Sequence, residues 1–431
     1  MSDKNQINKL NKKQILELLF SLQRFGIKPG LERTEKLLEF CGNPQNQFSS
    51  IHIAGTNGKG SVSSMIASVL QEAGCKVGLY TSPHILEFNE RIRINGKQIS
   101  DDELVRYSRE LLPFSLENKC TFFEITTVLA FKYFADNKVD VAIVETGMGG
   151  RFDSTNILKP VLSVITSVAK DHEKYLGNSL EEIAFEKAGI IKQNTPVVLG
   201  SVSPELNNIF ESKAKETKSK IIYSEENAKV SDIQFTPLLG MKLVLNTKNK
   251  SYGTLEIPLA GQHQIKNLIT AITAIENMSE YFGVTDENII SGVKNVKLNT
   301  GISYRLELVR KSPPMIIDTA HNPDSVAMAV DTLIKCGYTD KLNILFAAMA
   351  DKDINGMLEF LKPICKKLFI TIPDIERAET PENIAKHATG LGFQDIEIFR
   401  SVETASRKIN EFCEPALIIG SFYLVCDVLK G

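Results

Sequence analysis

The sequence predicts an α/β protein built from two domains, each with a parallel sheet. The chain has 431 residues, a length that suggests two or three domains at roughly 100–200 residues each. Short apolar runs alternate with amphipathic helical patterns along most of the chain, and this alternation is typical of parallel sheets. The pattern breaks between residues 296 and 303 and then resumes. We therefore expect a first domain over residues 1–296 and a second over residues 297–431.

The first domain is expected to open with a helix, because an apolar stripe at helical spacing is formed by Ile15, Leu18, Leu19 and Leu22. After it, strands are predicted at residues 48–54, 77–80, 139–144, 161–166 and 195–199, and helices at residues 62–70, 124–136 and 179–188. Residues 221–260 change to short alternating runs with polar turns, which indicates a small β-rich patch. A further helix carries an apolar face made of Ile265, Leu268, Ile269 and Ile272.

The second domain repeats the alternation. Strands are predicted at residues 315–317, 343–347, 367–372, 395–399 and 416–419. One of the helical patterns between them places apolar residues at i, i+3, i+4, i+7 and i+8, namely Val326, Ala329, Val330, Leu333 and Ile334. This order favours a second parallel sheet.

Composition excludes several classes of function. Fifty basic and 52 acidic residues give a net charge of −2, so no nucleic-acid partner is expected. No apolar run approaches the roughly 20 residues needed to cross a bilayer, and the polar N-terminus has no signal-peptide core. Seven cysteines without a C-x-x-C pair favour reduced thiols over disulfides or zinc. We expect a cytoplasmic protein without membrane partners, and nothing demands more than a monomer.

A glycine-rich segment at residues 55–61 (GTNGKGS) lies between a predicted strand and a predicted helix. Glycines let backbone N–H groups curl round an anion, and the start of the helix adds a positive dipole end. Lys59 can reach the outer phosphates of a nucleotide, and Ser61 can meet a phosphate or its metal. The glycine spacing differs from both the G-x-x-x-x-G-K-[ST] and the G-x-G-x-x-G patterns. A plain strand-to-helix turn with a solvated lysine is the alternative.

Two further charged residues stand out before any comparison with a family. Glu145 ends the apolar run at residues 139–144, where parallel sheets hold ligands, and its carboxylate suits Mg²⁺. A surface glutamate is the alternative. Lys187 has apolar helical neighbours at every i±3 and i±4 position, namely Ile183, Ala184, Ile190 and Ile191. It is therefore expected on a buried face, where an unpaired ammonium is costly, unless it snorkels past these neighbours.

An ordered set of segments resembles the folylpolyglutamate synthase/dihydrofolate synthase family of the Mur ligase superfamily. In chain order they are RFGI (24–27), GLER (30–33), GTNGKGS (55–61), TSPH (81–84), ETGMGGR (145–151), DH (171–172), EKAGIIK (186–192), GQHQ (261–264) with Asn267, RLE (305–307), DTAHNP (318–323) and GSFYL (420–424). The sequence departs from the family at GISYR (301–305), where a Trp-Pro-Gly-Arg-like string is usual, and at Thr319, where Gly or Val is common. The resemblance implies a P-loop-type central ATPase domain with a mainly parallel sheet and a small β-rich patch, followed by a Rossmann-like C-terminal ligase domain.

The resemblance also implies a reaction and its site residues. ATP would phosphorylate a pteroate or folate carboxylate, and L-glutamate would attack the acyl phosphate. The catalytic residues would be Lys59, Lys187 and His321, with Lys187 carbamylated. ATP would be bound by Asn57, Gly58, Lys59, Gly60, Ser61, Asn267, Arg305 and Asp318. Mg²⁺ would be held by Ser82, Glu145 and His172, and the pteroate or folate by Thr121, Phe122, Phe123, Glu124, Phe152, Asp153 and Ser154.

Alternatives remain at several of these positions. Two consecutive phenylalanines at the start of a helix are more often core residues, and Asn322 can simply cap the helix that Pro323 begins. Asp153 can merely cap the turn before Thr155. For the whole chain, the acceptor can be dihydropteroate, tetrahydrofolate or both. Another Mur-type amino acid ligase is the alternative enzyme, and a P-loop nucleotide switch is the alternative from a different class.

Overall fold

The computed structural model describes residues 7–22, 30–411 and 413–430, and its internal contacts divide the chain into two units. Unit 1 comprises residues 1–229, 247–250 and 266–301, and unit 2 comprises residues 230–246, 251–265 and 302–431. This division differs from the predicted boundary at residues 296/297, because most of the β-rich patch groups with unit 2. The predicted boundary stays a prediction. The resemblance segment at residues 24–27 lies outside the described residues. None of the described helices combines the length and the apolar character needed to cross a membrane.

The described part of unit 1 is built on an eight-stranded sheet. Its strands are β1 (Ser49–Ala54), β2 (Val77–Tyr80), β3 (Ile92–Ile94), β4 (Lys97–Gln98), β5 (Val141–Glu145), β6 (Leu162–Ser167), β7 (Val197–Ser201) and β8 (Ile221–Tyr223). Their order is β4-β3-β2-β5-β1-β6-β7-β8, and all pairs are parallel except those that β3 makes at one edge. The five strands predicted for this domain are confirmed, and β2 matches its prediction residue for residue.

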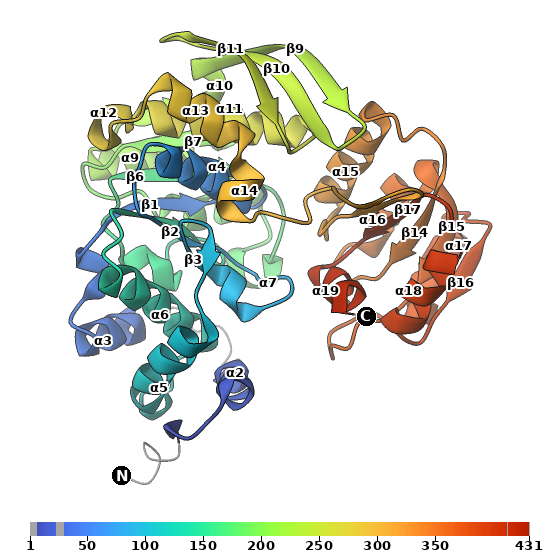
Figure 1. The fold of residues 1–431 in the computed structure, drawn as a ribbon, viewed down its shortest axis with the longest axis horizontal. Coiled ribbons are helices and arrows are strands. Elements are labelled where there is room, and N and C mark those ends of the chain that lie inside the picture. Colours follow the sequence, from blue (N-terminus) through green and yellow to red (C-terminus); the bar gives the residue numbers. More distant parts are fainter. Residues whose placement is uncertain (1–6, 23–29, 412, 431) are drawn as a thin grey trace. The chain divides into compact units, whose positions relative to one another are not determined.

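Helices cover both faces of this sheet. They are α2 (Lys12–Ser21), α3 (Glu32–Phe40), α4 (Lys59–Glu72), α5 (Asp101–Glu117), α6 (Phe122–Asp136), α7 (Glu173–Leu176), α8 (Leu180–Ala188), α9 (Asn207–Thr217), α10 (Ser224–Asn227), α11 (Gln262–Glu276), α12 (Ser279–Phe282), α13 (Asp286–Lys294) and α14 (Val296–Thr300). Helix α4 packs with α13 and α14 on one face, while α5 and α6 lie together on the other (Figure 1). Short 3₁₀ turns occur at Pro44–Asn46, Phe88–Arg91, Ser154–Ile157 and Pro204–Leu206.

Unit 2 contains two sheets. The β-rich patch is a three-stranded antiparallel sheet in the order β11-β10-β9, formed by β9 (Ala228–Thr236), β10 (Gly240–Thr247) and β11 (Ser251–Ile257). The second sheet has β12 (Glu307–Lys311), β13 (Pro314–Ile317), β14 (Leu342–Phe346), β15 (Cys365–Ile370), β16 (Ile396–Ile398) and β17 (Ala416–Ile419). Its order is β12-β13-β17-β14-β15-β16, with only β12 antiparallel in the described residues. Its helices are α15 (Pro323–Lys335), α16 (Ile354–Leu361), α17 (Pro381–Gly390), α18 (Val402–Glu411) and α19 (Phe422–Lys430), and a 3₁₀ turn follows α16 at Lys362–Ile364.

The central strands β1, β5 and β6 of unit 1 end side by side at the carboxyl edge of the sheet. Every residue of β5 is buried, as expected for a parallel strand covered on both faces. The register pairs Ile53 of β1 with Glu145 of β5, and Ala54 of β1 with Ile165 of β6. The carboxyl ends of these strands therefore lie side by side, where open α/β sheets bind ligands.

Candidate active site

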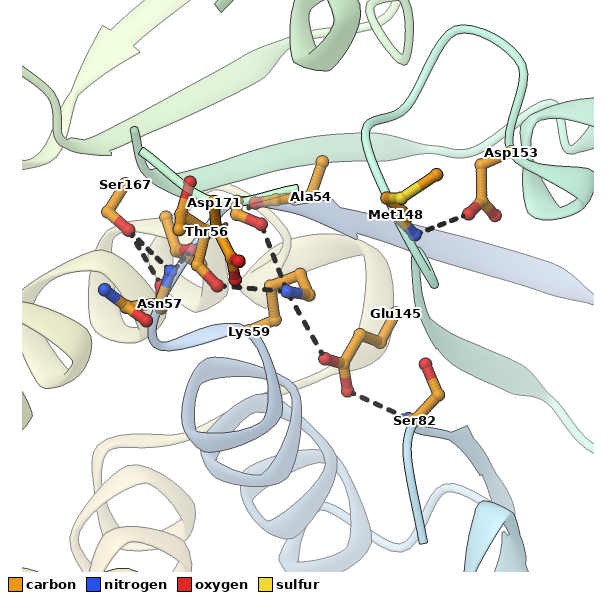
Figure 2. A network of polar contacts seen from close by, with 12 residues as sticks. Ala54, Thr56, Asn57, Lys59, Ser82, Glu145, Met148, Asp153, Ser167 and Asp171 are labelled. Carbon is orange, nitrogen blue, oxygen red and sulfur yellow. Dashed lines mark hydrogen bonds and ion pairs between the residues drawn. The ribbon is translucent and has the colours of Figure 1, made fainter. Parts of the chain in front are cut away.

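The glycine-rich loop follows β1 directly and is fixed to the end of β6. Asn57 N–H donates to Ser167 Oγ at 3.0 Å, and its carbonyl accepts from Thr166 Oγ1 at 2.7 Å (Figure 2). Gly58 adopts φ +86° and caps α4, a conformation that favours glycine. A Cβ at Gly58 would collide with the side chain of Asn267, so the structure places this predicted ATP residue of α11 against the loop.

Lys59, Ser82 and Glu145 come together next to this loop. Lys59 Nζ donates to the carbonyls of Gly55 and Thr56, both at 3.1 Å, and lies 3.9 Å from Glu145 Oε1. The other Glu145 oxygen accepts from Ser82 N–H at 3.4 Å. Figure 2 shows this chain of contacts from the loop to the ends of β2 and β5. The glutamate side chain is only 5% exposed, so Glu145 is not a surface residue.

The predicted metal ligands do not form a complete protein cage. His172 has a half-exposed side chain at the start of α7, with Nε2 3.8 Å from Asp171 Oδ2. Among the described residues, no three His, Cys, Asp or Glu side chains are grouped as a metal site. The oxygen donors of Glu145 and Ser82 nevertheless fit Mg²⁺, because this ion commonly binds one or two carboxylates together with water and substrate phosphates.

Lys187 is buried on α8, as predicted, but the helix ends at Ala188, so Ile190 and Ile191 are not its helical neighbours. It is 2% exposed. Burial, helped by the charge of Lys59, lowers the pKa of Lys187 to about 7, although Asp171 and Asp153 oppose the shift. The loop that follows β5 packs tightly against α8, since a Cβ at Gly150 would lie 2.8 Å from the Glu186 carbonyl.

The segment at residues 121–124 is a helix start as well as a candidate substrate contact. Thr121 caps α6 and forms a capping box with Glu124, whose buried carboxylate also binds Arg33 at 2.9 Å. Phe122 belongs to the core, and its ring stacks on Phe20 at a centroid distance of 5.4 Å. Phe123 lies against Gly147, where a Cβ would collide with its ring.

Asp153 is a buried carboxylate with several donors. Oδ1 accepts from Thr155 N–H at 3.0 Å and from the Thr155 hydroxyl, and Oδ2 accepts from Met148 N–H at 2.9 Å. Burial raises the pKa of Asp153, while these hydrogen bonds oppose the rise. The turn-capping alternative is therefore present in the structure. Ser154 is buried beside it, whereas Phe152 is 43% exposed under the Arg151 guanidinium.

Unit 2 carries a second group of predicted residues. Asp318 accepts from Leu306 N–H at 2.7 Å and from Ala320 N–H at 2.6 Å, and burial raises its pKa against the opposing charge of Arg305. The Arg305 guanidinium donates to Thr319 Oγ1. The ring of Phe422 lies 5.3 Å from His321 and 5.5 Å from the Arg305 guanidinium. Arg305, Asp318 and His321 thus gather around Thr319 and Phe422.

Two family models match the chain, one after the other. Residues 53–275 match the Mur ligase middle domain, and residues 304–421 match the Mur ligase glutamate ligase domain. A dihydrofolate synthase/folylpolyglutamate synthase of Bacillus subtilis (strain 168) is 36% identical over 420 residues, which cover 94% of this chain and 96% of the relative. The chain belongs to the folylpolyglutamate synthase/dihydrofolate synthase family. It is an ATP-dependent ligase of the Mur type.

Further members of the folylpolyglutamate synthase/dihydrofolate synthase family resemble the chain over its whole length. The folylpolyglutamate synthase of Lacticaseibacillus casei is 33% identical over 434 residues, covering 97% of this chain and 98% of the relative. The structure of the Mycobacterium tuberculosis folylpolyglutamate synthase complexed with ADP has a TM-score of 0.90 at 29% identity, and covers 99% of this chain and 98% of that chain. The fold predicted for this family is confirmed in both units.

Some residues of the site had no predicted role. Arg33 holds Glu124, Ser167 holds Asn57, and Phe422 lies between His321 and Arg305. Arg33 and Phe422 fall inside segments that resemble the folylpolyglutamate synthase/dihydrofolate synthase family, so the family match could have found them. Ser167 lies outside those segments, and its position at the end of β6 was its only signal. Asn322 is an N-cap, since its Oδ1 accepts from Ser325 N–H at 2.9 Å.

Proposed function

We propose that the chain joins L-glutamate both to dihydropteroate and to reduced folates such as tetrahydrofolate, using ATP with Mg²⁺. The observation that carries the ATP-dependent part of this proposal is the contact of the glycine-rich loop with Glu145. There Lys59 and Ser82 meet a buried carboxylate at the ends of β2 and β5. The loop supplies N–H groups and a cation for phosphates, and the carboxylate supplies a ligand for their metal.

The reaction has two steps that balance without another reactant. An oxygen of the acceptor carboxylate attacks the γ-phosphorus of ATP, and the bond to the bridging oxygen breaks, giving an acyl phosphate and ADP. The glutamate amine then attacks the acyl carbon, loses a proton and displaces phosphate, which carries away the oxygen that came from the carboxylate. Preorganised positive charge accelerates the first step. We assign that role to Lys59 and the N–H groups of residues 57–61, with Asn267 as a further ATP contact.

We assign the magnesium contacts to Glu145 and Ser82, with His172 as the third ligand that the family resemblance implies. When bound there, the ion would neutralise phosphate charge. Arg305 and Asp318 are the proposed ATP contacts of unit 2, and His321 is its proposed catalytic residue. Ring contacts with Phe422 hold His321 and Arg305 close to each other.

Lys187 is proposed to act as a carbamate. Its pKa of about 7 leaves a large share of the amine neutral at neutral pH, and a neutral amine is the form that adds CO₂. The carbamate replaces a positive charge with a negative one in a buried place. Lys187→Ala should therefore lose activity and recover part of it with short carboxylic acids. Lys187→Arg should not recover, and full activity of Lys187→Arg would exclude the modification.

The acceptor side is proposed to involve residues 121–124 and 152–154. Phe123 and the turn at Asp153 both contact the loop that follows Glu145. If Asp153 also serves the pterin, Asp153→Ala should reduce ligation to dihydropteroate much more than extension of tetrahydrofolate. Equal losses would identify Asp153 as a turn cap alone.

The direct test of the proposal compares the two acceptors with the unmodified enzyme. Dihydropteroate or tetrahydrofolate is supplied at saturation with ATP, Mg²⁺ and labelled glutamate, and labelled product is separated and counted. We expect both to be glutamylated. If dihydropteroate gives no dihydrofolate while tetrahydrofolate is extended, bifunctionality is refuted and polyglutamylation stands. We also propose a cytoplasmic monomer, because seven cysteines without a C-x-x-C pair fit a reducing compartment.

A further inference from the structure

His52 is a fully buried polar ring in the middle of β1. It pairs in register with Val144 of β5 and Ser163 of β6, in a strand whose other inner residues are mostly apolar. Its Nε2 lies 2.8 Å from Thr155 Oγ1, and its Nδ1 has no hydrogen-bond partner among the described residues. Burial, helped by the charge of Lys192, lowers the pKa of His52 to about 3. The ring is therefore neutral at physiological pH and carries one proton.

The position of that proton follows from the neighbours of Thr155. The Thr155 hydroxyl has one hydrogen, and it contacts both His52 Nε2 and Asp153 Oδ1. Burial raises the pKa of Asp153, but its carboxylate already accepts hydrogen bonds from the N–H groups of Thr155 and Met148, which favour the ionised form. An ionised carboxylate only accepts, so the hydroxyl donates to Asp153 and accepts from His52, and His52 carries its proton on Nε2.

The opposite direction is costlier. It needs a protonated Asp153 that donates to Thr155, and a Thr155 hydroxyl that donates to His52. The ring proton would then sit on Nδ1, where no described group accepts it. A buried N–H without an acceptor loses its full hydration, whereas an unused lone pair at Nδ1 is less demanding.

We propose that His52 is a positioning residue for the acceptor side of the active site. Its Nε2–H holds Thr155, Thr155 holds Asp153, and Asp153 fixes the Met148 turn of the loop at residues 146–150. This loop follows Glu145, and its Gly147 packs so closely on Phe123 that a Cβ would collide with the ring. A shift of the loop is therefore passed to Phe123. The glycine-rich loop at residues 55–61 is fixed separately, by hydrogen bonds to the end of β6. It should therefore be affected less by a shift of the loop at residues 146–150.

The first test measures the proton directly and does not depend on activity. The protein contains six histidines, and ¹⁵N-labelled histidine gives each ring a separate signal, with His52 assigned by its loss in His52→Gln. We expect a neutral ring with the proton on Nε2 between pH 6 and 8. A proton on Nδ1, or a charged ring in this range, would overturn the proposal.

The second test uses the different reach of two amides, in the variants His52→Gln and His52→Asn. A glutamine side chain at this position can place its amide nitrogen where Nε2 lies, whereas the shorter asparagine places its amide nitrogen where Nδ1 lies. Thr155→Val removes the hydroxyl at nearly constant shape. We expect His52→Gln to stay close to the unmodified enzyme. His52→Asn and Thr155→Val should each raise the acceptor KM about tenfold, the size of one lost hydrogen bond, with the KM for ATP nearly unchanged.

The double variant His52→Asn/Thr155→Val decides whether the two residues act as one unit. Residues in one hydrogen-bond network show non-additive effects, so the double variant should be no worse than either single variant. Additive losses, or equal damage by His52→Gln and His52→Asn, would overturn the proposal. These kinetic predictions rest on the proposed function. If the unmodified enzyme glutamylates neither acceptor, that function fails, while the tautomer measurement still tests the His52 assignment.

Discussion

Lys59 carries the charge that the proposed mechanism needs most at the phosphates. Its ammonium contacts nearby loop carbonyls and Glu145, and these contacts are local, so its removal should leave the fold intact. Lys59→Ala should lower the ligation rate by about 10²–10³, the usual effect of removing one preorganised donor. Lys248→Ala is the matched control, because that side chain is 63% exposed on the hairpin at residues 247–250. A Lys59→Ala enzyme within a few-fold of the unmodified one would remove the loop from the mechanism.

Lys187 should make stability depend on pH. Its pKa is about 7 in the folded protein and 10.5 as the ordinary value, so the unfolded chain binds the extra proton between these two values. Stability should therefore rise as pH rises from about 7 toward 10.5. Lys187→Met carries no titrating amine, so the variant should have a higher Tm than the unmodified protein. This difference in Tm should be larger at pH 7 than at pH 10. Melting curves in CO₂-free buffer measure this, and a constant difference across the range would contradict the buried, uncharged environment.

The residue roles differ in how well sequence could predict them. Apolar neighbours at helical spacing predicted a buried face for Lys187, although only Ile183 and Ala184 of those neighbours lie in α8. The end of an apolar run placed Glu145 at the ligand-binding edge of the sheet. The capping role of Asp153 was one of two local alternatives. The link from His52 to Thr155 spans 103 positions, and it depends on how β1 lies against the turn after β5. No local pattern reports such a distance.

At the scale of elements, the loop after β5 and the end of α8 form one tightly packed joint. Arg151 N–H donates to the Glu186 carbonyl at 2.8 Å, and its guanidinium binds the Glu186 carboxylate at 2.6 Å. A Cβ at Gly189 would lie 2.5 Å from Arg151 Cα, which is backbone that cannot turn aside. This joint keeps α8 against the loop and so keeps Lys187 covered.

Gly189→Ala should therefore destabilise the protein by about 1–3 kcal/mol, the usual cost of overpacking. Gly390→Ala is the matched control at the end of α17, because its Cβ would meet nothing within 4 Å. There alanine should stabilise by up to about 1 kcal/mol through its helix propensity. Urea unfolding of both variants measures the difference. Equal effects of the two substitutions would show that the joint tolerates a methyl group.

Strand positions were predicted well because parallel strands are continuous apolar runs bounded by turns. The β-rich patch was recognised as such. The sequence assigned it to the first domain, whereas contacts group most of it with unit 2. The alternating apolar pattern of the β-rich patch shows that one face of each strand is covered. It does not show which part of the chain covers that face. Grouping depends on contacts such as the hydrogen bond from Tyr338 to the Pro237 carbonyl, which joins residues about a hundred positions apart.

At the scale of the whole molecule, the reaction should need residues of both units. Arg305, Asp318 and His321 belong to unit 2, whereas Lys59 and Glu145 belong to unit 1. In the full-length chain, Arg305→Ala should lower ligation by about 10² or more, although every unit 1 residue is intact. Arg400→Ala is the control, since that side chain is 82% exposed. Unchanged ligation by a folded Arg305→Ala enzyme would place the chemistry within unit 1.

The central claim is that ATP activates the acceptor carboxylate before glutamate attacks, and an oxygen label tests this most directly. Tetrahydrofolate labelled with ¹⁸O in its γ-carboxylate is incubated with the enzyme, ATP, Mg²⁺ and L-glutamate, and the released phosphate is analysed by mass spectrometry. The account predicts one ¹⁸O atom in the phosphate formed with each new amide bond, because the acyl phosphate passes its carboxylate oxygen to phosphate. Phosphate without ¹⁸O, released at the same rate when glutamate is omitted, would show hydrolysis of ATP by water and would contradict the account.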